Sequence, residues 1–438
     1  MEYIKSKFYE KASKQATEYQ RLKNNHADKV IGKVTIGDVM LGMKGIPSLI
    51  TDTSKLDPND GIRFRGYSIP EIREKLPRLH PQGEPLPEGL FYLMLIGEIP
   101  EQEDAHNLSK SWAIRANVPQ HVFDVIEAMP KGTRPMAQFS AAILSMATES
   151  FFQNAYLAGI NKKYYWDTIY EDVMNLIARL PRIAAYIYRR MFHNDEHIEP
   201  DPRLDWAGNL AHMMGHSSDE VKRLMRLYMV IHADHEGGNV TAHTTHLVGS
   251  ALSNPYYAYA AGMLGLAGPL HGYANQDTIS WIFDLIHELD NDDPSEEQIA
   301  NYCLRTIEQG RVIPGYGHAV LRITDPRFTV QKEFADKYIK SNNLVNIVNK
   351  LYKVVPPILE KTGKVKNPWP NVDAYSGVLL HHYGIKEHTF YTVLFGVSRA
   401  LGVLASLVYD RVYGLPIERP SSYPLQWYKD VADGKITP

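Results

Sequence analysis

Three ionisable side chains in the second half of the chain lie on short segments rich in glycine and proline. His271 lies in GLAGPLHGYANQ, with no charged residue within five positions on either side. His318 lies in VIPGYGHAVLRITDPR, and Asp373 lies in KNPWPNVDAYSG. Catalytic side chains are often presented by loops on a rigid scaffold. Two histidines and a carboxylate on such turns therefore predict a catalytic site.

The surroundings of Asp373 and His271 predict their charge states. Asp373 falls in the first turn of a predicted helix, and a helix N-terminus favours an ionised carboxylate that can act as a base. His271 begins a predicted helix after Pro269, where a positive charge is disfavoured, so a neutral imidazole that donates a hydrogen bond is expected. A base and a neutral donor suit the enolisation of a carbon acid. His318 would polarise a second carbonyl.

Arginines near these segments predict an anionic substrate. Arg399 stands in the middle of the apolar stretch 390–409, and Arg327 and Arg419 flank the region. A buried guanidinium needs a partner, and forked arginines suit a small di- or tricarboxylate. The same Arg399 argues against a membrane span, because an arginine at the bilayer centre costs roughly 2.5–3.5 kcal/mol.

Two other kinds of site are weighed and rejected. The histidines and glutamate of HADHEGGNVTAHTTH resemble metal ligands, but their spacing matches neither H-E-x-x-H nor H-x-x-E-H, and Gly237-Gly238 interrupts the helix that such motifs need. We therefore expect no metal. Gly315-Tyr-Gly317 begins like a dinucleotide fingerprint but lacks the third glycine and a strand–helix frame.

The composition is that of an ordinary globular protein of 438 residues, long enough for two domains. Its net charge of −3 argues against a broad nucleic-acid surface. The single cysteine, Cys303, excludes an internal disulfide and fits a reducing compartment. The N-terminus shows no secretory signal or transit peptide, although a cleaved presequence would be absent from a mature form.

The hydrophobic pattern predicts a mainly α fold with a few short N-terminal strands. We expect strands within 30–39 and 51–67, and helices over most of the chain after residue 70. Glycine and proline breaks near 268–272 and 377–384 predict hinges that bracket an inserted smaller domain.

The segments quoted above, together with GIRFRGYSIPE, EPLPEGLFYLMLIGEIP and TVLFGVSRALGVLA, resemble the citrate synthase family of the eukaryotic mitochondrial type. The similarity covers nearly the whole chain. It implies a two-domain, mostly helical subunit with a large domain at 1–273, a small domain at 274–378 and a return to the large domain at 379–438. It also implies condensation of acetyl-CoA with oxaloacetate and water to citrate and CoA, the first step of the tricarboxylic acid cycle.

The resemblance implies a role for each candidate residue. Asp373 would remove the methyl proton of acetyl-CoA, His271 would stabilise the enol, and His318 would polarise the oxaloacetate carbonyl. The residues implied to bind oxaloacetate or citrate are His235, Asn239, Arg327, Arg399 and, from the partner subunit, Arg419. Those implied to bind CoA are Lys44, Lys162, Leu270, Val312, Pro314, Gly315, Gly317, Arg322, Lys364, Lys366 and Asn371.

Departures from the family pattern are few. Lys44 and Lys162 stand where arginine is common, which keeps the charge but loses the bidentate fork. Thr241 stands where serine is common, and we expect no consequence.

The resemblance further implies a homodimer in the mitochondrial matrix, with no cofactor besides the co-substrate CoA and no nucleic-acid or membrane partner. Two alternatives stay open at this point. A 2-methylcitrate synthase would use propionyl-CoA, and one methylene in an apolar pocket discriminates by only about 1–3 kcal/mol. A structural homologue that has lost activity is the other, although the catalytic and arginine positions are intact.

Overall fold

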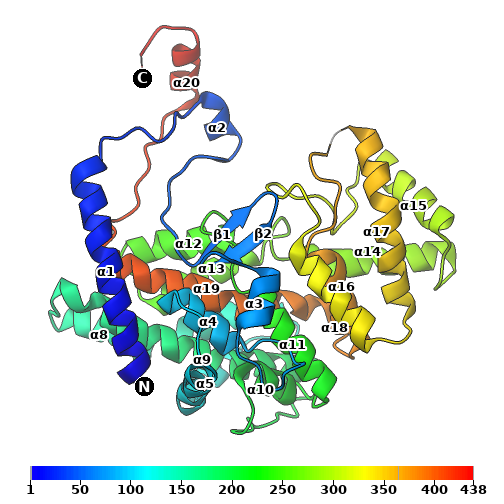
Figure 1. Ribbon diagram of the computed structural model, residues 1–438, viewed down its shortest axis with the longest axis horizontal. Coiled ribbons are helices and arrows are strands. Elements are labelled where there is room, and N and C mark those ends of the chain that lie inside the picture. The colour runs from blue at the N-terminus through cyan, green and yellow to red at the C-terminus, as the bar shows by residue number, and fades with distance from the viewer. Residues whose placement is uncertain (1, 364, 438) are drawn as a thin grey trace.

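The computed structural model describes residues 2–363 and 365–437, and it consists mostly of helices (Figure 1). The strands described, β1 Ser54–Asp57, β2 Gly61–Phe64 and β3 Tyr67–Ser68, form one antiparallel sheet in chain order. Ser54 pairs with Phe64, and Asp57 pairs with Gly61 across the turn. The predicted mainly α fold with a few short N-terminal strands is confirmed.

The helices fall into two sets, and the chain returns to the first set after the second for its last three helices, η3, α19 and α20. The first set contains α1 Glu2–His26, α2 Ile36–Met40, α3 Ile69–Lys75, α4 Pro87–Ile96, α5 Gln102–Arg115, α6 Gln120–Ala128, α7 Pro135–Ser145, η1 Met146–Glu149, α8 Phe151–Leu157, η2 Lys162–Tyr164, α9 Tyr165–Phe192, α10 Trp206–Met213, α11 Asp219–Ile231, α12 Val240–Ser250, α13 Pro255–Leu266, η3 His388–Phe390, α19 Tyr391–Tyr413 and α20 Leu425–Ala432. The second set contains α14 Ala274–Leu289, α15 Glu296–Glu308, α16 Pro326–Tyr338, α17 Asn343–Thr362 and α18 Asp373–His382.

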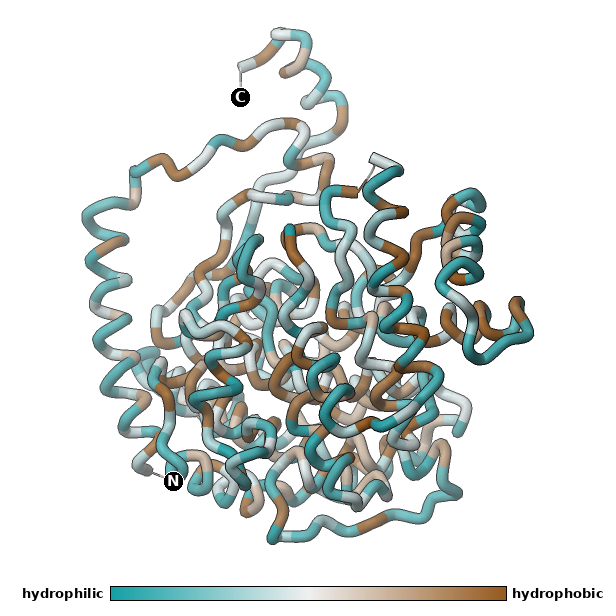
Figure 2. Tube along the Cα trace, turned by 45° about the vertical axis from the view of Figure 1, so that its right-hand side comes forward, coloured by the Kyte–Doolittle hydropathy of each residue, from teal (hydrophilic) through white to brown (hydrophobic). Residues whose placement is uncertain are grey.

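Helix α19 forms the centre of the first set and packs against α9, α12, α4 and α11. Within the described residues, 388–413 is the one helical stretch long and apolar enough to cross a membrane, but most of it is buried inside the protein. Figure 2 shows apolar residues gathered in the body of the molecule, whereas the segments that carry α2 and α20 project from it. Arg399 lies in the middle of this buried helix.

The second set of helices packs on itself at one side of the body (Figure 1). Helices α15 and α16 of this set begin at residues with strong capping signals. Ser295 caps α15 in a capping box with Gln298, and Asp325 caps α16 directly before Pro326. This set meets the first set through α3, α11 and α19. The loops that carry His318 and Asp373 belong to it.

The predicted strand within 30–39 is wrong. Residues 27–35 are an extended segment, and α2 follows it. Thr35 starts α2 with a capping box in which its side chain and that of Asp38 exchange hydrogen bonds with the backbone. Val30 and Ile31 are exposed, so their alternating pattern has no core to face and no neighbouring strand to pair with.

Glu88 in α4 carries a carboxyl group that is buried in the interior of the first set of helices. It accepts a hydrogen bond from the backbone N–H of Trp206 at 2.9 Å. Asp205 lies close by and forms an ion pair with Arg226 at 2.6 Å. Burial, with the negative charge of Asp205, raises the pKa of Glu88 to about 7.

Replacing Glu88 with Gln should reduce the pH dependence of stability. The folded-state pKa exceeds the unfolded value of about 4.3, so the stability that Glu88 contributes is fully present below that pH and is lost as pH rises through about 7. Between about pH 5 and pH 8, the unfolding free energy of the wild type should fall on the order of 1–3 kcal/mol relative to that of Glu88→Gln. Denaturant unfolding of both proteins across this range measures the difference. Parallel stability curves would contradict the assignment.

Candidate active site

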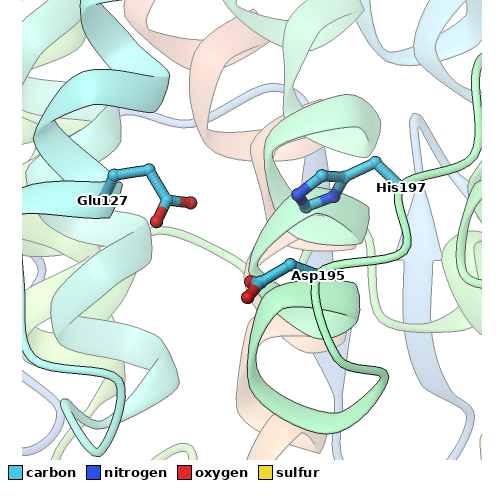
Figure 3. A group of neighbouring side chains, drawn as sticks. All are labelled: Glu127, Asp195 and His197. Carbon is cyan, nitrogen blue, oxygen red and sulfur yellow. The ribbon is translucent and has the colours of Figure 1, made fainter.

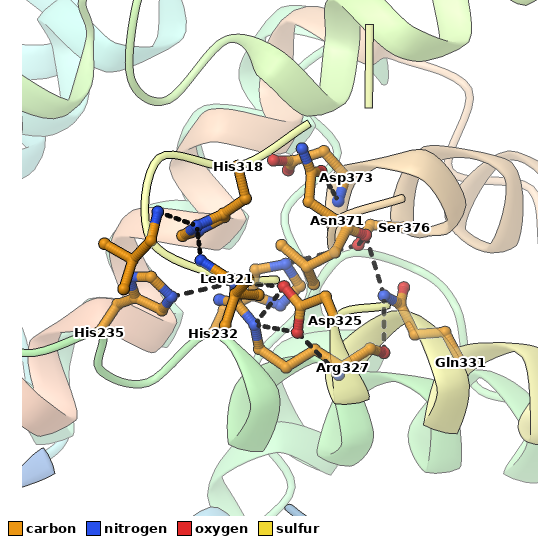
Figure 4. A network of polar contacts seen from close by, with 12 residues as sticks. His232, His235, His318, Leu321, Asp325, Arg327, Gln331, Asn371, Asp373 and Ser376 are labelled. Carbon is orange, nitrogen blue, oxygen red and sulfur yellow. Dashed lines mark hydrogen bonds and ion pairs between the residues drawn. The ribbon is translucent and has the colours of Figure 1, made fainter. Parts of the chain in front are cut away.

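The loop before His318 is joined to the start of α18 by Asn371. The backbone N–H of Asn371 donates to the Gly315 carbonyl at 2.9 Å, and its Nδ2 donates to the Gly317 carbonyl at 3.1 Å. Its Oδ1 accepts the backbone N–H of Asp373 at 3.0 Å (Figure 4). A Cβ at Gly315 would lie 2.8 Å from the Cα of Ala374, so glycine is required for this close approach. Two loops separated in sequence are thus brought together.

His318 is neutral and has a defined tautomer. Its Nδ1 accepts the backbone N–H groups of Val320 and Leu321, each at 3.0 Å. A nitrogen that accepts two N–H bonds carries no proton, so the proton resides on Nε2. Burial, and then the charge of Arg327, lowers the pKa of His318 to about 4. The side chain therefore offers a neutral N–H donor at neutral pH.

His271 is also neutral, as predicted, but for a different reason. It lies in the turn before α14, which begins only at Ala274. Burial, and then the charge of Arg399, lowers the pKa of His271 to about 4. Its Nε2 accepts the backbone N–H of Thr241 at 3.3 Å and lies 2.7 Å from the Thr241 hydroxyl. Because the backbone group can only donate, the ring proton is on Nδ1.

Asp373 is the first residue of α18, as the sequence predicts. Burial raises the pKa of Asp373 to about 6, and the nearby positive charge of Arg327 opposes the rise. Burial thus outweighs the effect of the helix N-terminus that favoured a low pKa. The carboxylate is still mostly ionised at neutral pH, and a base with a pKa near the working pH suits proton transfer.

Arg399 is a guanidinium that is 1% exposed. It donates from Nε to the His232 carbonyl at 3.0 Å and from Nη1 to Asn239 Oδ1 at 3.2 Å, and it lies over the Phe395 ring. Among the described residues, no carboxylate forms an ion pair with it. Burial lowers the pKa of Arg399 to about 10, which still leaves it charged. A buried positive charge with only neutral partners is ready to bind an anion.

Arg327 and His235 lie beside His318. Arg327 donates to both oxygens of Asp325 and, at 3.2 Å, to Nε2 of His235. The rings of His235 and His318 meet edge to face at 5.5 Å. Burial, and then Arg327 and Arg399, holds the pKa of His235 well below its usual range. Sequence reasoning missed the pairing of Arg327 with Asp325. In the sequence, Asp325 before Pro326 indicates only the cap of a helix.

Strand β1 holds the turn that carries His235. Asp234, which is buried, accepts the hydroxyls of Thr53 at 2.6 Å and Ser54 at 2.8 Å. The N–H of Glu236 donates to the Ser54 hydroxyl at 2.8 Å, and Glu236 has a left-handed φ of 55°. Sequence reasoning missed these contacts because they join residues about 180 positions apart.

The remaining candidates are Arg419 and the residues that the sequence resemblance implies for CoA binding. Pro314, Gly315 and Gly317 are in the His318 loop, and Arg322 donates back to the carbonyls of Ala319, Val320 and Leu321. Leu270, Val312 and Lys366 are exposed, and Lys364 lies outside the described residues. Lys44 is on the projecting segment, Lys162 lines a cavity with Arg411, and Arg419 is exposed after α19. Within the described part of the chain, no hydrogen bond joins these last three candidates to His271 or His318.

A group with metal-ligand character lies elsewhere, on the surface. Glu127, Asp195 and His197 bring one possible ligand atom each within 4.8 Å (Figure 3). Glu127 is paired with Arg190 at 3.1 Å, and Asp195 is paired with Lys131. The carboxylates are therefore neutralised by cations from the chain itself, and the group is separate from the histidines of the site.

Comparisons with known proteins show the family of the chain. The family model described as citrate synthase, C-terminal domain, matches residues 42–421. The mitochondrial citrate synthase 4 of Arabidopsis thaliana is 51% identical, over 97% of this chain and 89% of its own. The probable mitochondrial citrate synthase of Glossina morsitans morsitans is 54% identical, over 94% and 89%. The citrate synthase structure from Pyrobaculum aerophilum, 26% identical, superposes with a TM-score of 0.76 over 91% of this chain and 98% of its own. The chain therefore belongs to the citrate synthase family.

Proposed function

We propose that Asp373, His271 and His318 catalyse the condensation of acetyl-CoA with oxaloacetate and water to citrate and CoA. As a family member the chain is an acyltransferase that converts the acyl group into alkyl on transfer. The observation that carries the residue assignment is the set of charge states. The site contains a base with a pKa of about 6 and two neutral N–H donors, and both the base and His271 lie within the electrostatic influence of Arg399, a buried arginine without an ion pair among the described residues.

The first step is the loss of a methyl proton from acetyl-CoA. Asp373 takes the proton as the C–H bond breaks, and the electron pair moves into the thioester carbonyl. The Nδ1–H of His271 donates to the oxygen that gains negative charge. Because Nε2 of His271 accepts a hydrogen bond from Thr241, the ring proton stays on Nδ1 and remains available as the donor. A neutral donor stabilises this oxygen without transferring a full positive charge to the site.

The second step joins the enol carbon to the ketone carbon of oxaloacetate. The Nε2–H of His318 donates to the ketone oxygen and protonates it as the C–C bond forms. The methyl proton that Asp373 took in the first step returns through solvent to Nε2 of His318, which restores the neutral imidazole. Water then cleaves the C–S bond of the citryl thioester, which releases citrate and the CoA thiol.

The carboxylates of oxaloacetate are bound by the charged groups around this site. Arg399 supplies the guanidinium that lacks an ion pair, and Arg327, held by Asp325, supplies a second one. His235 and Asn239 line the same turn and orient the substrate. CoA would lie along the His318 loop, with Arg322 and the exposed Lys366 near its phosphates. The reaction uses side-chain acid–base chemistry, with no metal or prosthetic group.

Two features support a homodimer in which Arg419 serves the partner's site. Arg419 is exposed on the segment after α19, and no hydrogen bond joins it to the described residues of its own site. Large apolar side chains are exposed on neighbouring elements of the first set, namely Phe151, Leu157, Leu247 and Leu264. Residues 274–378 would act as a small domain that closes over the substrates, with 1–273 and 379–438 as the large domain.

Mixed dimers test the role of Arg419 directly. At an oxaloacetate concentration near the wild-type KM, neither Arg419→Ala nor Asp373→Asn homodimers should have appreciable activity, because every site lacks one group. When the two subunits are combined, one site of the mixed dimer contains both Asp373 and the partner's Arg419. We expect that dimer to recover about half of the wild-type activity. A mixed dimer as inactive as its parents would contradict action across the interface.

The compartment follows from the relatives. The curated relatives at about half identity are named as mitochondrial, and we assign this chain to mitochondria, with the matrix as the specific site. These names also favour citrate synthase over a 2-methylcitrate synthase.

The acyl-CoA preference tests the proposed activity. CoA release in the presence of oxaloacetate should show a higher kcat/KM for acetyl-CoA than for propionyl-CoA, by about 10-fold or more. A preference for propionyl-CoA would support the 2-methylcitrate alternative. A folded protein that releases no thiol with either substrate would establish an inactive homologue.

A further inference from the structure

The segment after α19 contains Arg419 but lacks regular structure of its own. Helix α19 ends at Tyr413, and Gly414 continues with a left-handed φ of 65°. Residues 415–424 are neither helix nor strand. Such a segment retains many conformations unless contacts hold it, and ordering it at the moment of binding reduces affinity. The residue next to Arg419, however, is firmly held.

Glu418 contacts helix α12 at three points. Its Oε1 lies 2.9 Å from Nε2 of His243, and its Oε2 lies 3.6 Å from Nε2 of His246. Its backbone N–H donates to the Ser250 hydroxyl at 3.0 Å. Backbone and side chain are thus both bound, which fixes the position of the residue and the direction in which the chain leaves it. We call His243, His246, Ser250 and Glu418 the Glu418 clamp.

His243, His246 and Ser250 share one face of α12, because their spacings of three and four positions correspond to about one helical turn. The first turn of the same helix belongs to the active site. Asn239 caps α12 and binds Arg399, and Thr241 contacts His271. One helix therefore joins the substrate turn of its own subunit to the segment that carries Arg419.

Asp410 of α19 orients the second histidine of the clamp. It is buried, and its Oδ2 lies 2.8 Å from Nδ1 of His246. Burial alone would lower the pKa of His246, but the carboxylates of Asp410 and Glu418 raise it above its usual value. The imidazole is held between two carboxylates, with Nε2 directed toward Glu418. The segment is thereby anchored to the central helix as well as to α12.

We propose that His243, His246 and Glu418 are positioning residues that hold Arg419 in the orientation needed to bind oxaloacetate in the partner's site. This inference rests on the proposed role of Arg419 across the dimer. Because the segment is already ordered, Arg419 binds the substrate carboxylate without a further loss of backbone freedom. The arrangement also makes α12 a mechanical link between the two sites of the dimer.

A double-mutant cycle between Glu418 and Arg419 tests the proposal in the full-length dimer. We expect Glu418→Gln to raise the KM for oxaloacetate about 10-fold, the effect of losing a charge-assisted hydrogen bond, with kcat and Tm nearly unchanged. Arg419→Ala should raise this KM further, and the double variant should match Arg419→Ala, because Glu418 acts only through Arg419. His243→Gln should reproduce Glu418→Gln. Glu297→Gln, at an exposed position of α15, is the matched control and should leave the KM unchanged.

The outcomes separate the two claims. If Arg419→Ala leaves the KM for oxaloacetate unchanged, the proposed role of Arg419 fails. If Arg419→Ala raises the KM but Glu418→Gln and His243→Gln do not, the positioning role is wrong. Additive effects in the double variant would overturn it as well, because Glu418 would then act independently of Arg419. A fall in Tm with a fall in kcat, and no selective change in KM, would show that the clamp only stabilises the fold.

Discussion

Asp373→Asn is expected to lower kcat by about 10³–10⁴-fold, because it removes the proposed base for the methyl proton. The substitution keeps the size of the side chain and its place at the start of α18. Oxaloacetate binding should change little, since Asp373 acts on the other substrate. Steady-state CoA release and calorimetric titration with oxaloacetate measure the two effects. A variant that keeps substantial kcat would remove Asp373 from its catalytic role.

The pH dependence of the wild type provides a second check on the same residue. Because the pKa of Asp373 is about 6 in the free protein, kcat/KM for acetyl-CoA should fall as pH decreases below that value. His271 and His318 have pKa values of about 4, so they add no inflection to the pH profile of kcat/KM near pH 6. If kcat/KM instead falls only near the ordinary pKa of an aspartate, burial does not raise the pKa of Asp373.

Arg399→Met is expected to abolish tight oxaloacetate binding without unfolding the protein. Truncating one side of a buried charge pair costs about 2–5 kcal/mol, which corresponds to about 30-fold to several thousand-fold in affinity. Without substrate, however, Arg399 has no ion pair among the described residues, so replacing it with an apolar chain of similar length relieves a buried charge. We therefore expect the Tm of the free protein to stay equal or rise.

Arg226→Met is the matched control for Arg399→Met. Arg226 is also buried, but it is paired with Asp205. Its loss leaves that carboxylate uncompensated and should lower stability, while the oxaloacetate affinity of the folded protein is retained. Thermal melts and calorimetry on both variants separate the two cases. If Arg399→Met binds oxaloacetate as tightly as the wild type, the assignment of Arg399 to the substrate is incorrect.

The parts of the site that the sequence predicts are those with local signals. Asp373 is recognisable because a proline and an asparagine precede a helical pattern, and it is indeed the first residue of α18. Arg399 stands out because a charge interrupts an apolar helix, and it is indeed buried. His271 is predicted to be neutral, and burial makes it so even though its helix begins later than expected. In each case composition within a few residues carries the information.

What the sequence does not reveal depends on contacts between distant segments. The backbone N–H of Thr241 sets the tautomer of His271, 30 positions away, a contact that no local pattern indicates. Asp234 reads as one more polar residue in a histidine-rich motif, whereas the hydroxyls of Thr53 and Ser54, at the start of β1, hold it in place. The 30–39 strand fails for the converse reason, since its alternating pattern meets no partner strand. Long-range pairing decides all three cases.

The most direct test of the account is the stoichiometry of product formation by the purified wild-type protein. With acetyl-CoA and oxaloacetate both present and no added metal or cofactor, we predict one citrate and one free CoA thiol for each acetyl-CoA consumed. With acetyl-CoA alone, thiol release should be negligible. Thiol release without citrate would indicate a simple thioesterase, and no release from a folded dimer would contradict the proposed catalysis outright.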